Sequence, residues 1–205
     1  VDHGSGPYCN NSIHVLRDML GVSATTNSIG ELCRSDVIVV DGVDLGMQLP
    51  TIGGIVIRAK LDGAKLIVID PRRHRLAEHA DYFLQVRPGT EVLVYGAMAK
   101  VIVDRGLMRQ SFVKAHCEDY DAFVAAVGRF DLLAAAEASG VAPELIEGAA
   151  LAYGRAGAAA WLYSTGVQAR SEDSIRSVVN LVLLTGNVGR PGAGVYALTE
   201  HNNLQ

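Results

Sequence analysis

Residues 36–42 read DVIVVDG, and residues 63–73 read GAKLIVIDPRR. Each segment holds an unbroken run of apolar, mostly β-branched residues that ends at an aspartate followed by glycine or proline. Such short, continuously apolar runs are typical of strands buried on both faces, as in a parallel sheet. We therefore expect buried parallel strands over residues 36–41 and 65–69.

The flanking segments extend this alternation. Residues 51–61 carry apolar side chains at helical spacing and end at Asp62-Gly63, where glycine is a common helix cap. Further strands are expected over residues 82–86 and 158–163. Strands that alternate with helices predict an α/β fold, here a Rossmann-like parallel sheet flanked by helices.

Helical patterns dominate the second half of the chain. Residues 91–105 are expected to form a helix with Thr90 as its N-cap, and residues 171–185 another. Between residues 107 and 157 only helical patterns occur, over residues 111–117, 120–127, 131–139 and 143–153. We interpret residues 1–205 as a single α/β region with a helical insertion at residues 107–157.

Composition excludes several classes of protein. Hydrophobic residues make up 49% of the chain and charged residues 20%, as in a soluble globular protein with a large core. The net charge of −4 favours neither nucleic acid nor an anionic membrane as a partner. No apolar run reaches the roughly 18 residues of a transmembrane helix, so no direct membrane insertion is expected.

The three cysteines, Cys9, Cys33 and Cys117, are odd in number and lack CxxC spacing. A disulfide framework is therefore not expected. A reducing compartment, the cytoplasm, is the expected location. Cys33 and Cys117 are predicted to be small buried or half-buried hydrophobic side chains.

Distinctive loops follow the predicted strands, at residues 42–46, 70–75, 87–91 and 164–168. In open α/β sheets, ligands bind outside the carboxyl ends of the strands. Glycines in these loops let backbone N–H groups approach phosphate, and Arg72 and Arg73 offer charge-assisted hydrogen bonds. Asp70 is placed to accept ribose hydroxyls. These features predict an anionic nucleotide ligand, whereas His74 and His79 are expected on the surface.

Four segments resemble those of a known superfamily. They are SDVIVVDG (residues 35–42), GAKLIVIDPR (63–72), HADYFLQVRPGTE (79–91) and LLTGNVGRPGAGV (183–195). Together with the closing NN-x-Q, they resemble the molybdopterin-dinucleotide oxidoreductases, and among these the catalytic subunits of formate dehydrogenases. The resemblance covers nearly the whole chain and stops within a motif, so we expect a fragment of a larger enzyme.

The resemblance implies a set of cofactor-binding residues. They are Gly42, Asp44, Asp70, Pro71, Arg72, Gly89, Thr90, Glu91, Gly166, Gln168, Asn202, Asn203 and Gln205. Three positions depart from the family pattern. Asp44 stands where asparagine is usual, Leu45 replaces the usual proline, and the loop from Gly166 to Gln168 is one residue tighter.

The catalytic positions depart further from the family pattern. The family's metal ligand, a cysteine or selenocysteine, aligns with Tyr8 without gaps and with Cys9 after a one-residue shift. Cys9 is the better ligand chemically, because thiolates suit such metals. A site without a protein ligand is the third possibility. Thr199 stands where the family has a substrate-binding arginine, so no catalytic residue is assigned and formate oxidation is in doubt.

The implied cofactor is molybdopterin guanine dinucleotide carrying molybdenum or tungsten. It would support two-electron redox chemistry, with electrons passed to iron–sulfur clusters. The implied partners are the remaining domains of the polypeptide, an iron–sulfur domain and a C-terminal cap domain, and electron-transfer subunits. The isolated chain is expected neither to retain the cofactor nor to be active.

Two alternatives remain open from the sequence. One is a non-catalytic relative, like the large peripheral subunit of respiratory complex I, which keeps the fold for assembly and electron-transfer support. The other is a plain NAD-binding enzyme. It requires G-x-G-x-x-G after the first strand, where this chain has only Gly42 and Gly46 around Asp44.

Overall fold

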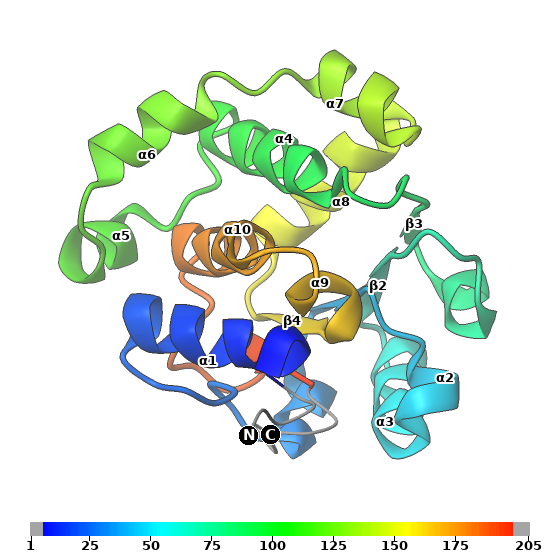
Figure 1. Ribbon diagram of the computed structural model, residues 1–205. Helices are drawn as coiled ribbons and strands as arrows, with labels where there is room; N and C mark the ends of the chain where they lie inside the picture. Colours follow the sequence, from blue (N-terminus) through cyan, green and yellow to red (C-terminus); the bar gives the residue numbers. More distant parts are fainter. Residues whose placement is uncertain (1–5, 199–205) are drawn as a thin grey trace.

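The computed structural model describes residues 6–198, with side chains from Asn10 onward (Figure 1). Its centre is a five-stranded parallel sheet in the order β3-β2-β1-β4-β5. The strands are β1 (Val37–Asp41), β2 (Lys65–Ile69), β3 (Tyr82–Leu84), β4 (Ala159–Tyr163) and β5 (Gly194–Ala197). The predicted α/β class is confirmed.

Because all paired strands are parallel, their carboxyl ends lie at the same edge of the sheet. At its centre, Val39 pairs with Ile67 of β2 and with Trp161 of β4. β3 ends two residues before the predicted position because the Val86 N–H donates to the Leu84 carbonyl within its own segment, at 3.0 Å. β5 was not predicted, since its four residues are too few for a periodic pattern and follow a glycine-rich loop.

Helices cover both faces of the sheet (Figure 1). One face carries α1 (Gly6–Leu20), α4 (Glu91–Asp104), α8 (Pro143–Arg155) and α10 (Glu172–Leu184). The other carries α3 (Pro50–Leu61) and the 3₁₀ helices η1 (Ile29–Arg34) and η2 (Arg75–His79). Alternation along β1 divides the core, because Val37 and Val39 face the first layer while Ile38 and Val40 face the second.

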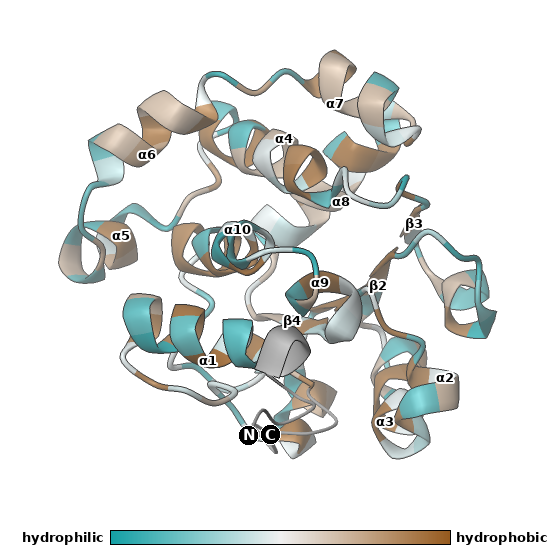
Figure 2. Ribbon diagram, viewed as in Figure 1, coloured by the Kyte–Doolittle hydropathy of each residue, from teal (hydrophilic) through white to brown (hydrophobic). Residues whose placement is uncertain are grey.

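The first layer contains a long helix, α1, that the sequence did not predict. α1 packs against α10 and buries Val15 and Leu16 completely. Figure 2 shows hydrophobic and hydrophilic bands along both helices, as expected for elements with one face on the core. α1 also contacts α9, and its Ser12 hydroxyl accepts a hydrogen bond from the Tyr163 hydroxyl at the end of β4, at 3.1 Å, so the core is larger than the predicted elements alone would make it.

Three short helices lie outside α4 and α10 (Figure 1). They are α5 (Gln110–His116), α6 (Tyr120–Val127) and α7 (Leu132–Ser139), close to the predicted helical segments. α6 and α7 contact α4, whereas α5 contacts α10. The extent of a helical insertion over residues 107–157 stays a prediction.

The thiols differ in part from expectation. Cys33 is exposed, not buried, because it lies in the short helix η1 with its side chain turned from the core, and its Sγ contacts the Gly30 carbonyl at 3.0 Å. Cys117 is half-buried, as predicted. Within residues 6–198, none of the helices is long and apolar enough to cross a lipid bilayer.

Candidate functional site at the carboxyl edge of the sheet

The strand order reverses between β1 and β4. From β1 the chain proceeds outward through β2 to β3, whereas from β4 it proceeds to β5 on the other side. At such a switch point, neighbouring loops leave the sheet in opposite directions and open a crevice for ligands. The loops here begin with Gly42 after β1 and with Ser164 after β4.

Two glycines bring these loops together. Gly42 has a φ of +62°, and a Cβ atom placed on it would lie 3.0 Å from the Cα of Gly166. A Cβ on Gly166 would lie 2.8 Å from the Cα of Gly42. Both positions therefore need glycine, and the two backbones form one wall of the crevice.

A cavity of about 170 Å³ lies beside this wall. Six of the predicted cofactor-binding residues line it, namely Gly42, Asp70, Pro71, Arg72, Glu91 and Gly166. The remaining lining residues are Asp41, Ile69, Val86, Val167 and Arg170. The structure thus brings together residues from the ends of four strands and from the start of α4, which are far apart in the sequence.

Asp41 is a buried carboxyl at the cavity that the sequence did not single out. Its Oδ2 accepts hydrogen bonds from the Tyr95 hydroxyl at 2.7 Å and from the Trp161 indole Nε1 at 3.0 Å. Burial raises the pKa of Asp41 from its ordinary value of 3.8 to about 7, although both hydrogen bonds lower it. The sequence did contain a signal for this buried acid, because Asp41 is an aspartate at the end of an otherwise apolar strand.

Two predicted carboxyls complete the acidic lining. Asp70 is 3% exposed, and its Oδ1 accepts a hydrogen bond from the Arg72 backbone N–H at 2.8 Å. Glu91 is also buried, and its Oε2 accepts from the Gly89 N–H at 2.8 Å. The Arg72 guanidinium is mostly exposed and lies 3.7 Å from Asp70. The cavity therefore has buried acceptors and a guanidinium at its mouth.

Three other predicted residues lie outside the cavity. Asp44 caps the short helix α2 (Leu45–Gln48), where its Oδ1 accepts from the Met47 N–H at 3.3 Å. Thr90 is the N-cap residue of α4, as predicted, but its hydroxyl donates to the Arg87 carbonyl at 2.7 Å and accepts no hydrogen bond from the helix. The hydrogen bond from this hydroxyl closes the turn before α4. Gly89, with a φ of +91°, permits that turn.

Gln168 is buried in α9 (Thr165–Gln168) and faces α1. Its Oε1 accepts from the Ser12 hydroxyl at 2.7 Å, and the Asn11 amide donates to its backbone carbonyl at 2.9 Å. Its Nε2 is buried without a hydrogen-bond partner among the described residues. Gln168 thus belongs to the contact between the β4 loop and the N-terminal helix.

The expectation for His74 was wrong. Its side chain is buried, since η2 folds back over the loop after β2, whereas His79 at the end of the same helix is exposed as expected. Two arginines on helices away from the cavity form ion pairs, Arg58 with Asp62 and Arg176 with Asp18.

Several predicted residues cannot be placed. Asn202, Asn203, Gln205 and Thr199 lie outside the described residues. Tyr8 and Cys9 lie in the first turns of α1, but their side chains are likewise outside the described part. Among the residues that are described, no group of three or more histidine, cysteine or acidic side chains is arranged to hold a metal ion.

The glycine-rich segment at residues 186–194 has a structural role at the opposite edge of the sheet. Asn187 Oδ1 accepts from the Ala159 N–H at 3.0 Å and from the Arg190 guanidinium at 2.7 Å. Arg190 also donates to the Gly186 carbonyl at 2.9 Å, and the Asn27 amide donates to the Arg190 carbonyl at 3.0 Å. These bonds fix the amino ends of β4 and β5.

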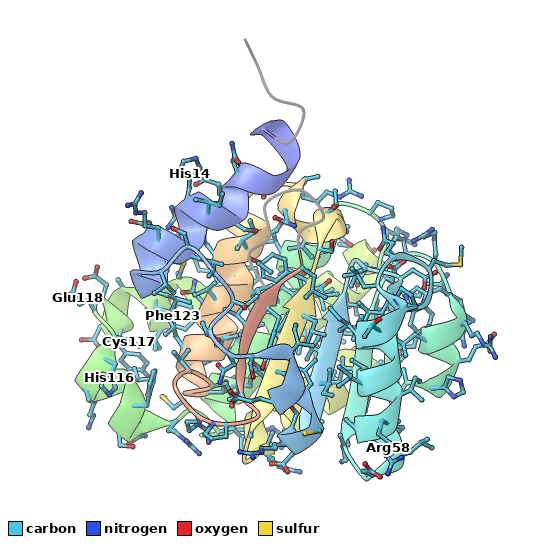
Figure 3. All side chains as sticks on the ribbon, turned by 90° about the horizontal axis from the view of Figure 1, so that it is seen from below. His14, Arg58, His116, Cys117, Glu118 and Phe123 are labelled. Carbon is cyan, nitrogen blue, oxygen red and sulfur yellow. The ribbon has the colours of Figure 1, made fainter. Side chains whose placement is uncertain are left out.

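A larger cavity of about 500 Å³ lies elsewhere, between α1, α10 and the α5–α6 loop. Figure 3 shows four residues of its lining, His116 in α5, Phe123 in α6, and Cys117 and Glu118 in the loop between these helices. None of its lining residues is a buried polar side chain. Because oriented polar groups fix a ligand, the cavity at the switch point is the better candidate.

The parallel sheet with helices on both faces, and the polar cavity at its switch point, define a doubly wound α/β protein with a candidate ligand site at the carboxyl edge of the sheet. The sequence model of the family described as "Molybdopterin oxidoreductase" matches residues 3–205. The chain belongs to this family, which confirms the resemblance inferred from the four segments.

Curated relatives agree with this placement. The chain is 38% identical over 207 residues to the F420-dependent formate dehydrogenase 1 subunit alpha of Methanococcus maripaludis, and the match covers 100% of the chain and 31% of that protein. It is 32% identical to formate dehydrogenase H of Escherichia coli, over 95% of the chain and 27% of that protein. The chain therefore spans less than a third of either relative.

A solved structure has the same fold. Acetylene hydratase from Pelobacter acetylenicus superposes with a TM-score of 0.84 at 26% identity, over 94% of this chain and 26% of that one. The chain is thus related to formate dehydrogenase alpha subunits and shares its architecture with an enzyme whose name states a different reaction.

Proposed function

We propose that this chain is the central molybdopterin-guanine-dinucleotide-binding part of a formate-dehydrogenase-like molybdenum or tungsten oxidoreductase. The observation that carries the proposal is the cavity at the switch point, lined by six residues that the family resemblance implied. Membership of the molybdopterin family supports the identity of the cofactor.

The residues present fit a guanine dinucleotide. Asp41, Asp70 and Glu91 supply buried oxygen acceptors, which suit the N–H groups of guanine and the hydroxyls of ribose. Arg72 at the mouth suits a phosphate oxygen. Because Gly42 and Gly166 lack side chains, the ligand can approach the backbone closely.

The cofactor, when bound, would supply two-electron redox chemistry at its metal. The residues of this chain bind and orient the nucleotide end and keep water from it. We assign electron transfer to iron–sulfur clusters held by other domains or subunits, and the isolated chain is expected to be inactive. The relatives are formate dehydrogenases by name, but Thr199 stands where the family has a substrate-binding arginine, so we assign no substrate to this chain.

Metal and pterin analysis of the full-length native protein tests this proposal. We expect molybdenum or tungsten together with stoichiometric pterin, which fluoresces after oxidation. A well-folded protein without pterin would overturn the proposal and favour a non-catalytic relative that keeps only the fold.

A further inference from the structure

Asp41 uses only one of its two carboxyl oxygens within the described part of the protein. The Tyr95 hydroxyl and the Trp161 indole N–H both donate to Oδ2, at 2.7 Å and 3.0 Å. Trp161 is itself held by edge-on ring contacts with Tyr95 and Tyr153, at 5.7 Å and 5.3 Å between centroids. Asp41 lines the cavity at the switch point. Oδ1 is therefore the oxygen of Asp41 that is left for a ligand.

The groups around Asp41 disfavour its ionised form. Its side chain is 1% exposed, and among the described residues it forms no ion pair with a lysine, arginine or histidine. Two more carboxyls, those of Glu91 on α4 and Asp70 after β2, line the same cavity. The two arginines of the lining, Arg72 and Arg170, are exposed. Nearby like charges and burial both favour the protonated form of a carboxyl.

The pKa of Asp41 agrees with this arrangement. Burial raises the pKa from 3.8 to about 7, the hydrogen bonds from Tyr95 and Trp161 lower it, and the charges of Glu91 and Asp70 raise it. The carboxyl therefore keeps its proton in mildly acidic solution. Because Oδ2 already accepts two hydrogen bonds, the proton belongs on Oδ1. A protonated carboxyl can donate a hydrogen bond, whereas a carboxylate only accepts.

We infer that Asp41 binds the nucleotide as a neutral acid, whose Oδ1–H donates a hydrogen bond to an acceptor of the ligand, namely a base carbonyl, a ribose hydroxyl or a phosphate oxygen. This inference rests on the proposed function. Asp41 thus adds a donor to a cavity in which Asp70 and Glu91 accept. Once ionised, Asp41 has no proton to donate and its charge repels the phosphates, so binding weakens as pH rises.

Retention of pterin by the full-length protein, followed by fluorescence from about pH 6 to about pH 9, tests the inference without an activity measurement. Asp41→Asn keeps the shape of the side chain and an oxygen for Tyr95 and Trp161. It also places an N–H donor where Oδ1 lies, at every pH. Asp104→Asn is the matched control, since it makes the same exchange at the exposed end of α4. Circular dichroism reports the fold.

We expect the parent to release pterin roughly tenfold to a hundredfold faster at the upper end of this pH range, as for the loss of one hydrogen bond to a charged ligand. The Asp104→Asn control should behave as the parent does. Asp41→Asn should release pterin slowly throughout, which also separates Asp41 from every other group that titrates in this range. A parent indifferent to pH, firmer retention at high pH, or an unchanged pH dependence in Asp41→Asn would overturn the inference.

Tyr95→Phe supplies a second readout, which packing alone would not move. It removes one of the two hydrogen bonds that lower the pKa of Asp41, so the carboxyl keeps its proton to higher pH. The rise in pterin release should therefore shift to higher pH than in the parent. A midpoint that stays in place in the folded variant would contradict a role for the Asp41 proton.

The two proposals fail in different ways. Parent protein without pterin contradicts the proposed function, whereas a parent that holds pterin and shows none of these pH effects contradicts only the role of Asp41. Should pterin be missing, calorimetry with guanosine and with inorganic phosphate decides. The inference then requires that the parent lose affinity for at least one probe from about pH 6 to about pH 8, and that Asp41→Asn lack this loss. The responding probe identifies the acceptor, and no response to either overturns the inference.

Discussion

Trp161 donates its indole N–H to Asp41 across the central pair of strands, at 3.0 Å from Oδ2. The two residues are 120 positions apart in the sequence and lie on adjacent parallel strands. Tyr95, on α4, donates to the same oxygen at 2.7 Å. A sheet residue and a helix residue thus hold one buried acid at the edge of the cavity.

This acid predicts a pH dependence of stability. The pKa of Asp41 is about 7 in the folded protein and near 3.8 when unfolded, so between these values the folded state alone keeps the proton. The free energy of unfolding should therefore fall as pH rises from about 4 to about 7, by a few kcal/mol at about 1.4 kcal/mol per pKa unit. Asp41→Asn should remove this contribution. Urea unfolding at pH 4.5 to 7.5 measures it, and equal slopes in parent and variant would contradict it.

The contact between Gly42 and Gly166 predicts a large effect of a small substitution. Gly166→Ala places a Cβ 2.8 Å from the Gly42 Cα, so backbone has to move. We expect a destabilisation of about 1–3 kcal/mol, as for overpacking in a core, together with faster pterin release. Gly54→Ala is the control, because Gly54 lies within α3 with open space around it. The control should be neutral or slightly stabilising, and two indistinguishable unfolding curves would speak against the close approach.

Glu91 has separable roles in the turn and at the cavity. Glu91→Gln keeps an oxygen that can accept from the Gly89 N–H but loses the charge, whereas Glu91→Ala loses both. We expect both variants to release pterin faster, by roughly tenfold to a hundredfold if the carboxylate accepts from a guanine edge. Only Glu91→Ala should also lower the Tm appreciably. Equal retention in Glu91→Gln and parent would remove Glu91 from the site.

Substitution of Asn187 by alanine should lower the stability of the protein without lowering its pterin content. Asn187→Ala leaves the Ala159 N–H and part of the Arg190 guanidinium without their acceptor, at the edge of the sheet opposite the cavity. The expected destabilisation is about 1–3 kcal/mol. Asn187→Asp retains an acceptor and should be affected less. Pterin content of the folded Asn187→Ala protein should equal that of the parent, and a selective loss of pterin would show that this edge affects the site.

The sequence predicted the central strands well because both faces of them are buried. In β1 and β2, continuous apolarity and a following turn residue mark the ends within one residue. β5 and α1 escaped prediction for different reasons. β5 is too short to show a period, and α1 has a mixed composition whose burial depends on α10, far away in the chain.

The candidate site was predictable only as a set of loops. Parallel strands bring Asp70, Glu91 and Gly166 to one edge, and the sequence indicated that much. It did not indicate that Asp41 faces Tyr95 and Trp161, since a strand pattern shows alternation but not the partners in the layer above. His74 was misjudged because its burial depends on how η2 folds back, which is a tertiary property.

The pairing of β1 with β4 also has a consequence for the order of events during synthesis. β2 follows β1 closely and can pair with it early, but β4 is made only after the whole segment between residues 70 and 158. Contacts between such distant segments form late, because a long loop has to close first. On the ribosome, a nascent chain would thus expose one side of β1 until Trp161 and Gly166 emerge. The crevice, which depends on both, can receive its ligand only after that step.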